Sequence, residues 1–305
     1  MTEERYFRQV ALLLQILPIV GEQEVFALKG GTAINLFVRD MPRLSVDIDL
    51  TYIPLESRDA SIKGISSGLT AIADKVKSSI TGNRIQKVPG PIKGTVGSLV
   101  VSTPQATIKI EPNHVLRGSV FPCETGILCS AAQEQFKADV QIKMLSFADL
   151  FGGKLCAALD RQHPRDLFDS KLLLEKDGIT QEVRQAFIIY LASHSRPIHE
   201  LLDPHHLDMR AVFESEFIGM SRTSVSYEEL ERAREDAVSK LRADLSNSER
   251  QFLLSVKEGA PKWNLLDLPG IEKLPGIPWK VQNIGRMDKE KHSQQLQKLR
   301  ECLSL

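Results

Sequence analysis

The spacing of apolar and polar residues gives the two halves of the chain different characters. Before residue 147, short apolar or alternating runs are separated by glycine and proline and interspersed with helical patterns. They predict strands at 25–29, 46–53, 84–88, 95–102 and 106–111, and helices at 3–17 and 58–78. This half is therefore expected to be α+β, with a mixed or antiparallel sheet flanked by helices.

From Phe147 onward, helical periodicity dominates and clear strand signals end. Helices are predicted at 147–161, from Pro164, at 181–193 and through 227–257. Pro164 fits an early helical position, where its missing N–H costs no hydrogen bond. The segment 261–284 is rich in proline and predicts an ordered loop. We therefore expect two domains, 1–146 and 147–305, the second mainly helical.

Composition adds few constraints. The 305 residues are 42% apolar and 26% charged, as in ordinary folded proteins. Lys and Arg number 39, and so do Asp and Glu, so no global positive field exists to attract nucleic acid. A nucleic-acid partner would need a local patch, for which the tail from Lys280 to Arg300, with six Lys or Arg residues and His292, is a candidate.

Localisation signals are lacking in the sequence. The apolar run near the N-terminus is short and fits an amphipathic helix, and no stretch of eighteen apolar residues occurs, so we expect no membrane partner. The four cysteines have neither zinc-ligand nor disulfide-framework spacing. A cytoplasmic protein with reduced thiols is the expectation.

A glycine turn and three acidic residues are the first candidates for chemistry. Gly30, Gly31 and Thr32 separate a predicted strand from a helix, where backbone amides can bind phosphate, although such a turn can equally be only a tight turn. Asp47 and Asp49 share one strand face and suit Mg²⁺, although acidic pairs also occur on solvated faces. Glu111 would complete a three-carboxylate metal site if its strand pairs beside theirs.

The predicted helix 147–161 carries a second set. Lys154 and Arg161 are seven residues apart and lie nearly on one helix face, with small residues between them. Asp166 and Asp169 follow at the start of the next helix, where the helix dipole favours acids. The alternative is that these charged residues are ordinary solvent-exposed side chains of the two helices.

These motifs together resemble the AbiEii-type nucleotidyltransferase toxins, the toxin half of bacterial type IV toxin–antitoxin systems. The resemblance rests on four patches in matching order. They are GGTAINL at 30–36, RLSVDIDL at 43–50, the 149–154 segment with Arg165-Asp166-x-x-Asp169, and the tail from Trp263 to Asn283. The glycine turn and D-x-D are shared with the wider DNA polymerase β-like superfamily.

The resemblance implies a fold, a reaction and residue roles. Residues 1–146 would be the nucleotidyltransferase core, and 147–305 a helical domain that completes the active-site cleft. NTP would be the substrate and two Mg²⁺ ions the cofactors, with Asp47, Asp49 and Glu111 as metal ligands. Gly30, Gly31, Thr32, Lys154 and Arg161 would bind the nucleotide. Asp47, Asp49, Glu111, Lys154, Asp166 and Asp169 would be catalytic, with either Asp166 or Asp169 as the functional acid.

The acceptor and the biological role remain expectations. The resemblance implies transfer to tRNA or to a protein acceptor, a block of growth or translation in abortive infection, and a separately encoded antitoxin that forms no stable complex with the toxin. Two other readings stay open. One is a small-molecule nucleotidyltransferase of the aminoglycoside-modifying kind, and the other is a non-catalytic nucleotide-binding protein.

Overall fold

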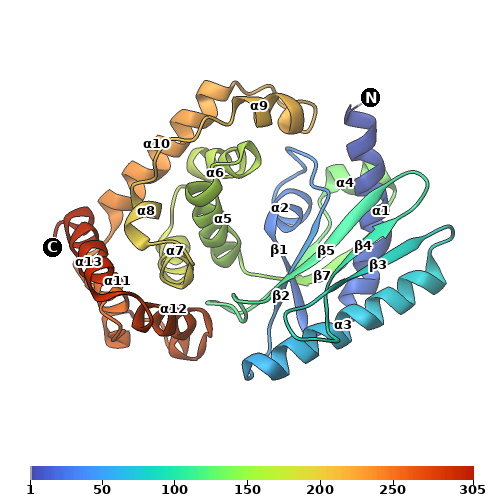
Figure 1. The fold of residues 1–305 in the computed structure, drawn as a ribbon. Coiled ribbons are helices and arrows are strands. Elements are labelled where there is room, and N and C mark those ends of the chain that lie inside the picture. The colour runs from blue at the N-terminus through green and yellow to red at the C-terminus, as the bar shows by residue number, and fades with distance from the viewer. Residues whose placement is uncertain (1) are drawn as a thin grey trace. The chain divides into compact units, whose positions relative to one another are not determined.

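A computed structural model describes residues 2–305, with side chains from Glu4 onward. The chain divides into two compact units. Unit 1 comprises Met1–Ser146 and Glu216–Ser224, and unit 2 comprises Phe147–Ser215 and Val225–Leu305. Figure 1 shows the sheet in unit 1 and the helices of unit 2. The expected α+β class, with a helical C-terminal part, is confirmed.

Unit 1 contains a seven-stranded mixed sheet with the order β3-β4-β5-β2-β1-β7-β6. Its strands are β1 (Phe26–Lys29), β2 (Ile48–Tyr52), β3 (Arg84–Pro89), β4 (Val96–Ser102), β5 (Thr107–Asn113), β6 (Glu124–Ile127) and β7 (Gln141–Met144). β2 pairs with β1 in antiparallel and with β5 in parallel orientation, and β1 pairs with β7 in parallel. The five predicted strands are confirmed, and β6 and β7 were missed.

Helices cover this sheet. Those of unit 1 are α1 (Thr2–Gly21), α2 (Gly30–Ala33), which continues as a π-helical turn over Ile34–Val38, α3 (Arg58–Ser79) and α4 (Ser130–Phe136). α1 and α3 contact each other and the sheet, α1 through β1, β5 and β7 and α3 through β3 and β4. Ser57 caps α3 by accepting a hydrogen bond from the amide of Ala60.

A distant segment completes unit 1. Residues 216–224 return to the first unit, where the amide of Leu44 donates to the carbonyl oxygen of Met220 at 2.8 Å. The amide of Arg222 likewise donates to the carbonyl oxygen of Pro42 at 2.9 Å. These bonds support the segment that leads into β2, and nothing in the local sequence pattern indicated them.

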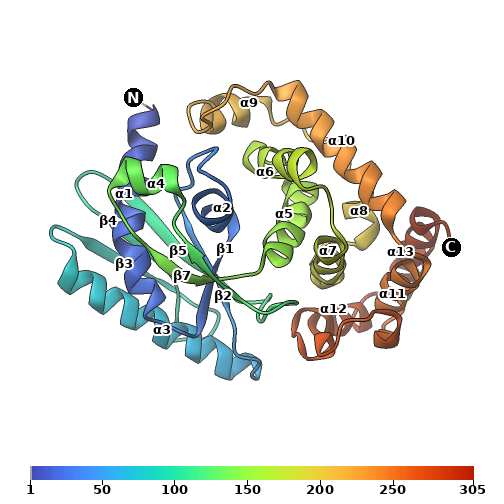
Figure 2. The ribbon, with the colours of Figure 1, turned by 180° about the vertical axis from the view of Figure 1, so that it is seen from behind.

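Unit 2 is helical. Its helices are α5 (Phe147–Arg161), α6 (Pro164–Lys176), α7 (Gln181–Ser193), α8 (Ile198–Leu202), α9 (Arg210–Val212), α10 (Tyr227–Asp244), α11 (Asn247–Lys257), α12 (Gly276–Gly285) and α13 (Lys289–Leu303). α5 packs against both α6 and α7, and Figure 2 shows it between them. Helix 147–161 is confirmed residue for residue, with Pro164 at the start of α6.

One prediction for unit 2 is refined and another was wrong. The helical run predicted through 227–257 is confirmed and is divided into two helices, because Ser246 and Glu249 form a capping box that begins α11. The segment 261–284 is not a loop throughout, since α12 occupies Gly276–Gly285 and short 3₁₀ turns precede it. Among residues 2–305, no helix is both long enough and apolar enough to cross a membrane.

Candidate functional site

The glycine turn lies directly against an acidic side chain of β2. β1 ends at Lys29, which pairs with Asp49, and α2 begins at the next residue. Gly30 has φ +72°, in the left-handed region that glycine adopts without strain. A Cβ at Gly30 would lie 2.3 Å from Oδ2 of Asp49. Glycine therefore lets the backbone approach this carboxylate closely.

A side chain at Gly31 would also clash, here with two residues to which the sequence motifs gave no role. A Cβ there would lie 2.8 Å from Nη2 of Arg43 and 2.9 Å from Oγ of Ser45. Arg43 is buried and donates from Nη1 to the carbonyl oxygen of Leu44 at 2.9 Å. The only sequence signal for Arg43 and Ser45 was their position just before the D-x-D pair.

Thr32 lies between the glycine turn and the acidic pair. Its side chain is fully buried, and its hydroxyl donates to the backbone carbonyl oxygen of Asp47 at 2.5 Å. It also lies 3.1 Å from the hydroxyl of Ser45. Thr32 therefore ties the glycine turn to the segment that carries the acidic pair.

The three carboxylates occupy neighbouring strands. Asp47 directly precedes β2, Asp49 lies within it, and both are half-buried, whereas Ile48 and Leu50 are fully buried. β5 pairs beside β2 with Glu111 opposite Asp49, so the strand pairing needed for a three-carboxylate cluster is present. Because side chains alternate along strands, paired residues project to the same face. Asp49 and Glu111 are therefore adjacent on one face.

The electrostatics of this cluster agree with the strand pairing. Desolvation raises the pKa of Glu111, Lys109 opposes the shift, and the charges of Asp49 and Asp47 raise it further. The three carboxylates therefore repel one another, which a bound cation would relieve. The oxygen donors fit Mg²⁺, which binds through one or two carboxylates together with waters and substrate phosphates. Among residues 2–305, no group of three or more His, Cys, Asp or Glu side chains is arranged so that it could hold a metal ion by itself.

A second cluster lies in unit 2. Lys154 on α5 is only 7% exposed, and its Nζ lies 2.9 Å from Oδ1 of Asp166 and 3.0 Å from Oδ2 of Asp169, both on α6. Both carboxylates are buried as well. The alternative of an ordinary solvent-exposed side chain is therefore wrong for Lys154. Spacing did not reveal this burial, because it depends on how α6 packs against α5.

Arg161 completes the cluster from the end of α5. Its side chain is 60% exposed, and Nε donates to Oδ2 of Asp166 at 2.5 Å while Nη2 donates to Oδ1 at 3.1 Å. Burial alone would raise the pKa of Asp166, but the charges and hydrogen bonds of Lys154 and Arg161 hold it well below its usual range. Asp166 therefore contacts both Lys154 and Arg161, and Asp169 shares Lys154 with it.

Of the six basic residues of the candidate patch in the tail, Lys280 alone is buried, and Arg286, Lys289, Lys291, Lys298 and Arg300 are exposed. Lys280 is buried, 7% exposed, and its Nζ donates to the carbonyl oxygens of His194 and Arg196 at the end of α7. Desolvation lowers the pKa of Lys280 to about 8. On α13, Arg300 pairs with Glu258 at 3.1 Å. Lys280 therefore fixes α12 to α7 and contributes no charge to a surface.

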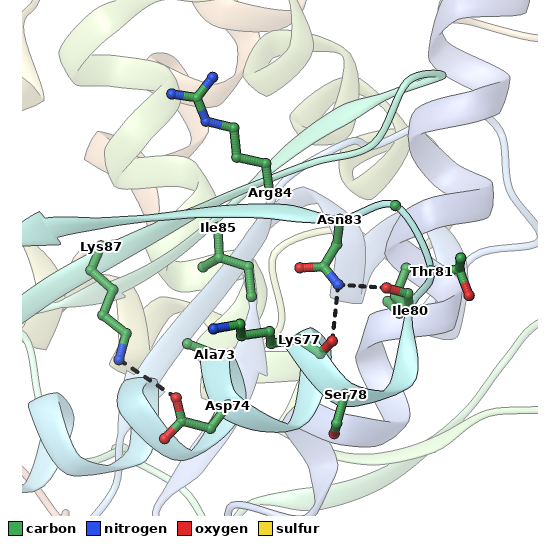
Figure 3. Close-up of a pocket in the computed structure, with 11 residues that line it drawn as sticks. Ala73, Asp74, Lys77, Ser78, Ile80, Thr81, Asn83, Arg84, Ile85 and Lys87 are labelled. Atoms are coloured by element: carbon green, nitrogen blue, oxygen red, sulfur yellow. Dashed lines mark hydrogen bonds and ion pairs between the residues drawn. The ribbon is translucent and has the colours of Figure 1, made fainter.

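A surface pocket lies elsewhere, where α3 ends and β3 begins (Figure 3). Nδ2 of Asn83 donates to the carbonyl oxygens of Ile80 and Lys77, and this closes the turn. Lys87 forms an ion pair with Asp74 at 3.7 Å. β3 is an edge strand, separated from β2 by β4 and β5. The pocket is therefore distinct from the carboxylate cluster.

Two comparisons with known proteins bear on the identity of the chain. The family model described as nucleotidyl transferase AbiEii toxin, type IV TA system, matches residues 11–274, which include all ten candidate residues. The fold is similar to that of MenT4, a nucleotidyltransferase toxin from Mycobacterium tuberculosis H37Rv. The TM-score is 0.59 and the identity 14%, with 93% of this chain and 95% of that chain covered. No curated protein matches the chain. Because the family match spans most of the chain, this protein belongs to the AbiEii nucleotidyltransferase toxin family of type IV toxin–antitoxin systems.

Proposed function

We propose that this chain transfers a nucleoside monophosphate from an NTP to an RNA acceptor, with tRNA as the acceptor class, in a Mg²⁺-dependent reaction that blocks growth. The observation that carries the proposal is the pairing of Asp49 with Glu111 beside the Gly30 turn. It joins oxygen ligands for a divalent cation to a glycine backbone suited to phosphate. Family membership supplies the reaction class.

In this proposal the carboxylates act on the reacting phosphate. An oxygen of the acceptor forms a bond to the α-phosphorus, the bond to the β-phosphate bridging oxygen breaks, and pyrophosphate leaves. Asp47 and Asp49 would hold Mg²⁺, which when bound neutralises triphosphate charge and orients it. Glu111 would hold a second ion or accept the acceptor's proton, for which its raised pKa suits it.

The remaining residues bind or position. The amides of Gly30 and Gly31 would contact the β- and γ-phosphates at the start of α2. Lys154 would neutralise charge on the leaving pyrophosphate. Asp166 and Asp169, with Arg161 behind Asp166, would keep that ammonium protonated and fixed, since a lysine buried alone tends to lose its proton. We therefore propose both acids as positioning residues, with Asp166 contributing more.

Charge distribution supports a polyanionic acceptor. Although the chain has no net charge, the segment 58–93, which forms α3, β3 and their connections, is strongly basic. It carries seven basic residues against two acidic ones, namely Arg58, Lys63, Lys75, Lys77, Arg84, Lys87 and Lys93 against Asp59 and Asp74. Phosphate contacts of lysine and arginine supply most non-specific nucleic-acid affinity. We propose this basic segment as the acceptor surface.

The decisive experiment incubates the purified full-length chain with each α-labelled NTP, Mg²⁺ and total bacterial tRNA. Asp47→Asn/Asp49→Asn is the inactive variant, and Asp74→Asn, which removes a carboxylate at the surface pocket, is the matched control. We expect label in tRNA with the wild type and Asp74→Asn only, and none when EDTA replaces Mg²⁺. Label in protein or in an aminoglycoside would instead identify the acceptor class and refute the RNA acceptor.

Mg²⁺-dependent NTP binding without product in any acceptor pool would favour a non-catalytic nucleotide-binding protein.

A growth assay addresses the toxin role. Induced expression of the wild type is expected to arrest a bacterial host, and Asp47→Asn/Asp49→Asn to permit growth. We further propose a separately encoded antitoxin that restores growth without forming a stable complex with this chain, which co-purification would test.

A further inference from the structure

The far end of β2 brings together residues from three strands of unit 1. The amide of Gly118 donates to the carbonyl oxygen of Tyr52, the last residue of β2, at 2.8 Å. This bond places Arg117 beside the end of β2. His114, which follows β5, lies with Nε2 3.0 Å from the carbonyl oxygen of Gly97 in β4. None of these residues belongs to the carboxylate cluster or to the basic segment.

Arg117 is buried there without hydrogen-bond partners for two of its nitrogens. Its side chain is 7% exposed, and Nε and Nη1 have no partner among the described residues. A guanidinium stays charged, and burying it without a partner is costly, so buried arginines normally pair with an acid or an anion. These two nitrogens are therefore hydrogen-bond donors for which the described residues supply no acceptor.

Arg117 lies among charges of both signs. Desolvation lowers the pKa of Arg117 and that of His114, and the charge of Arg58 lowers both further. Arg58 is the first residue of α3, whose N-terminal end carries the positive end of the helix dipole. Two acids lie close by: Glu56 accepts a hydrogen bond from the hydroxyl of Tyr52 at 3.0 Å, and Asp59 lies 4.0 Å from Nη1 of Arg58. These acids are thus engaged by Tyr52 and Arg58, while Nε and Nη1 of Arg117 have no partner among the described residues.

We propose that Arg117, together with Arg58 and the start of α3, binds a phosphate oxyanion. The guanidinium keeps its charge, and the N–H groups of Nε and Nη1 can each donate to a phosphate oxygen; charged hydrogen bonds of this kind are strong. Tyr52 is three residues beyond Asp49 on β2, about 10 Å along the strand. This phosphate is therefore a different one from the triphosphate assigned to the carboxylate end.

The phosphate has two sources that share this chemistry. One is a phosphodiester of the RNA acceptor, which would extend the basic segment at the start of α3. The other is a free phosphate or the phosphate of a small metabolite. Because binding is measured without nucleotidyl transfer, the test of this site stands apart from the test of the proposed function.

The first arm uses inorganic phosphate as the probe, titrated by calorimetry into the full-length protein at constant ionic strength. The variants are Arg117→Met, Arg117→Lys and, as control, Arg232→Met, which removes an exposed arginine of α10. We expect Arg117→Met to weaken the Arg117-dependent binding at least about tenfold, as loss of charged hydrogen bonds should. Arg117→Lys should fall between, and Arg232→Met should match the wild type.

Thermal unfolding shows whether Arg117→Met still folds. In phosphate-free buffer we expect this variant to melt at or above the wild-type temperature, because it removes a buried charge that lacks partners. Added phosphate should then raise the melting temperature of the wild type more than that of the variant. Equal phosphate affinity of wild type and Arg117→Met, with both folded, would overturn the proposal.

The second arm uses a tRNA transcript and distinguishes the two sources. If the phosphate is a phosphodiester, Arg117→Met should weaken RNA binding and reduce the slope of log affinity against log salt by about one. If it is a free phosphate, RNA binding should stay unchanged while phosphate binding is lost. Either result supports the site, and the KM for NTP is expected to stay at the wild-type value in both.

Discussion

Glu111 lies directly opposite Asp49 in the parallel pairing of β5 with β2. The pairing places two acidic side chains next to each other in the folded protein, and Asp47 adds a third charge. Such repulsion disfavours the folded state unless a cation is present. The repulsion among these carboxylates therefore makes the stability of the folded protein depend on pH and on metal binding, and both dependences can be measured.

Stability is expected to fall as pH rises at this cluster. The folded-state pKa of Glu111 is raised above its ordinary value of 4.5, so the folded protein binds this proton more tightly than the unfolded chain does. The contribution is unfavourable once Glu111 ionises, and it develops as pH rises from about 4.5 through the raised pKa. In urea unfolding from pH 4 to 8, the unfolding free energy of Glu111→Gln relative to that of the wild type should increase with pH.

A matched variant checks the cause. Asp49→Asn removes one charge that raises the pKa of Glu111, so its own pH-dependent loss of stability should be smaller than in the wild type. Adding Mg²⁺ at neutral pH should stabilise the wild type more than Asp49→Asn. A difference between Glu111→Gln and wild type that stays constant over the whole pH range would contradict this account.

Gly30 is expected to tolerate no side chain, both because its φ is positive and because a Cβ would contact Asp49. Gly94 separates these two effects. Both have positive φ, but a Cβ at Gly94 would meet nothing within 4 Å, whereas at Gly30 it would meet Asp49. Alanine should cost about 1 kcal/mol or more at either site through backbone strain. Only Gly30→Ala should also lose nucleotidyl transfer, by about a hundredfold. Comparable activity loss in both variants would show that the clash with Asp49 is unimportant.

Thr32→Val is expected to impair the acidic pair through the backbone. Valine keeps the shape but leaves the carbonyl oxygen of Asp47 without the hydroxyl donor, which should cost about 1–3 kcal/mol in unfolding free energy. Transfer activity should fall about tenfold or more, because Asp47 is displaced. Thr32→Ser retains the donor and should keep most activity. If both variants behaved alike, the methyl group and not the hydroxyl would be what matters.

Lys154→Met is expected to destabilise strongly, by about 3–5 kcal/mol, because it leaves two buried carboxylates without their shared cation. The variant Asp169→Asn leaves the pair between Lys154 and Asp166 in place and should cost less. Chemical denaturation ranks the variants. Transfer assays on folded protein then test whether Lys154→Met loses kcat beyond its loss of stability, as an electrostatic role requires.

Asp166 should show the opposite pH behaviour to Glu111. Its folded-state pKa lies well below the ordinary value of 3.8, so its stabilisation is fully present above that value and is lost as pH falls through the lowered pKa. Asp166→Asn should therefore be less stable than the wild type at pH 7, and the difference should shrink below about pH 4. A gap that persists unchanged into strong acid would place the stabilisation elsewhere.

Local pattern predicted most elements, and the misses have physical reasons. β6 and β7 are only four residues long; β6 lacks alternation, and the alternation of β7 is too short to stand out, so that the stability of both comes from pairing within the sheet. The break between α10 and α11 was visible in the Ser246 and Glu249 spacing but was masked by continuous helical periodicity. The start of α12 at Gly276 lies in a proline-rich stretch, where tertiary packing through Lys280 outweighs propensity.

The sequence by itself determined which faces are apolar and which residue types stand at each turn, because these depend on spacing over a few residues. It thereby placed Asp47 and Asp49 on one face and Gly30 at the end of β1. Tertiary structure alone decided the register of Glu111 against Asp49, the burial of Lys154 between two acids and the unpartnered nitrogens of Arg117. Contacts between residues far apart in the chain depend on the packing of whole elements, which no local pattern encodes.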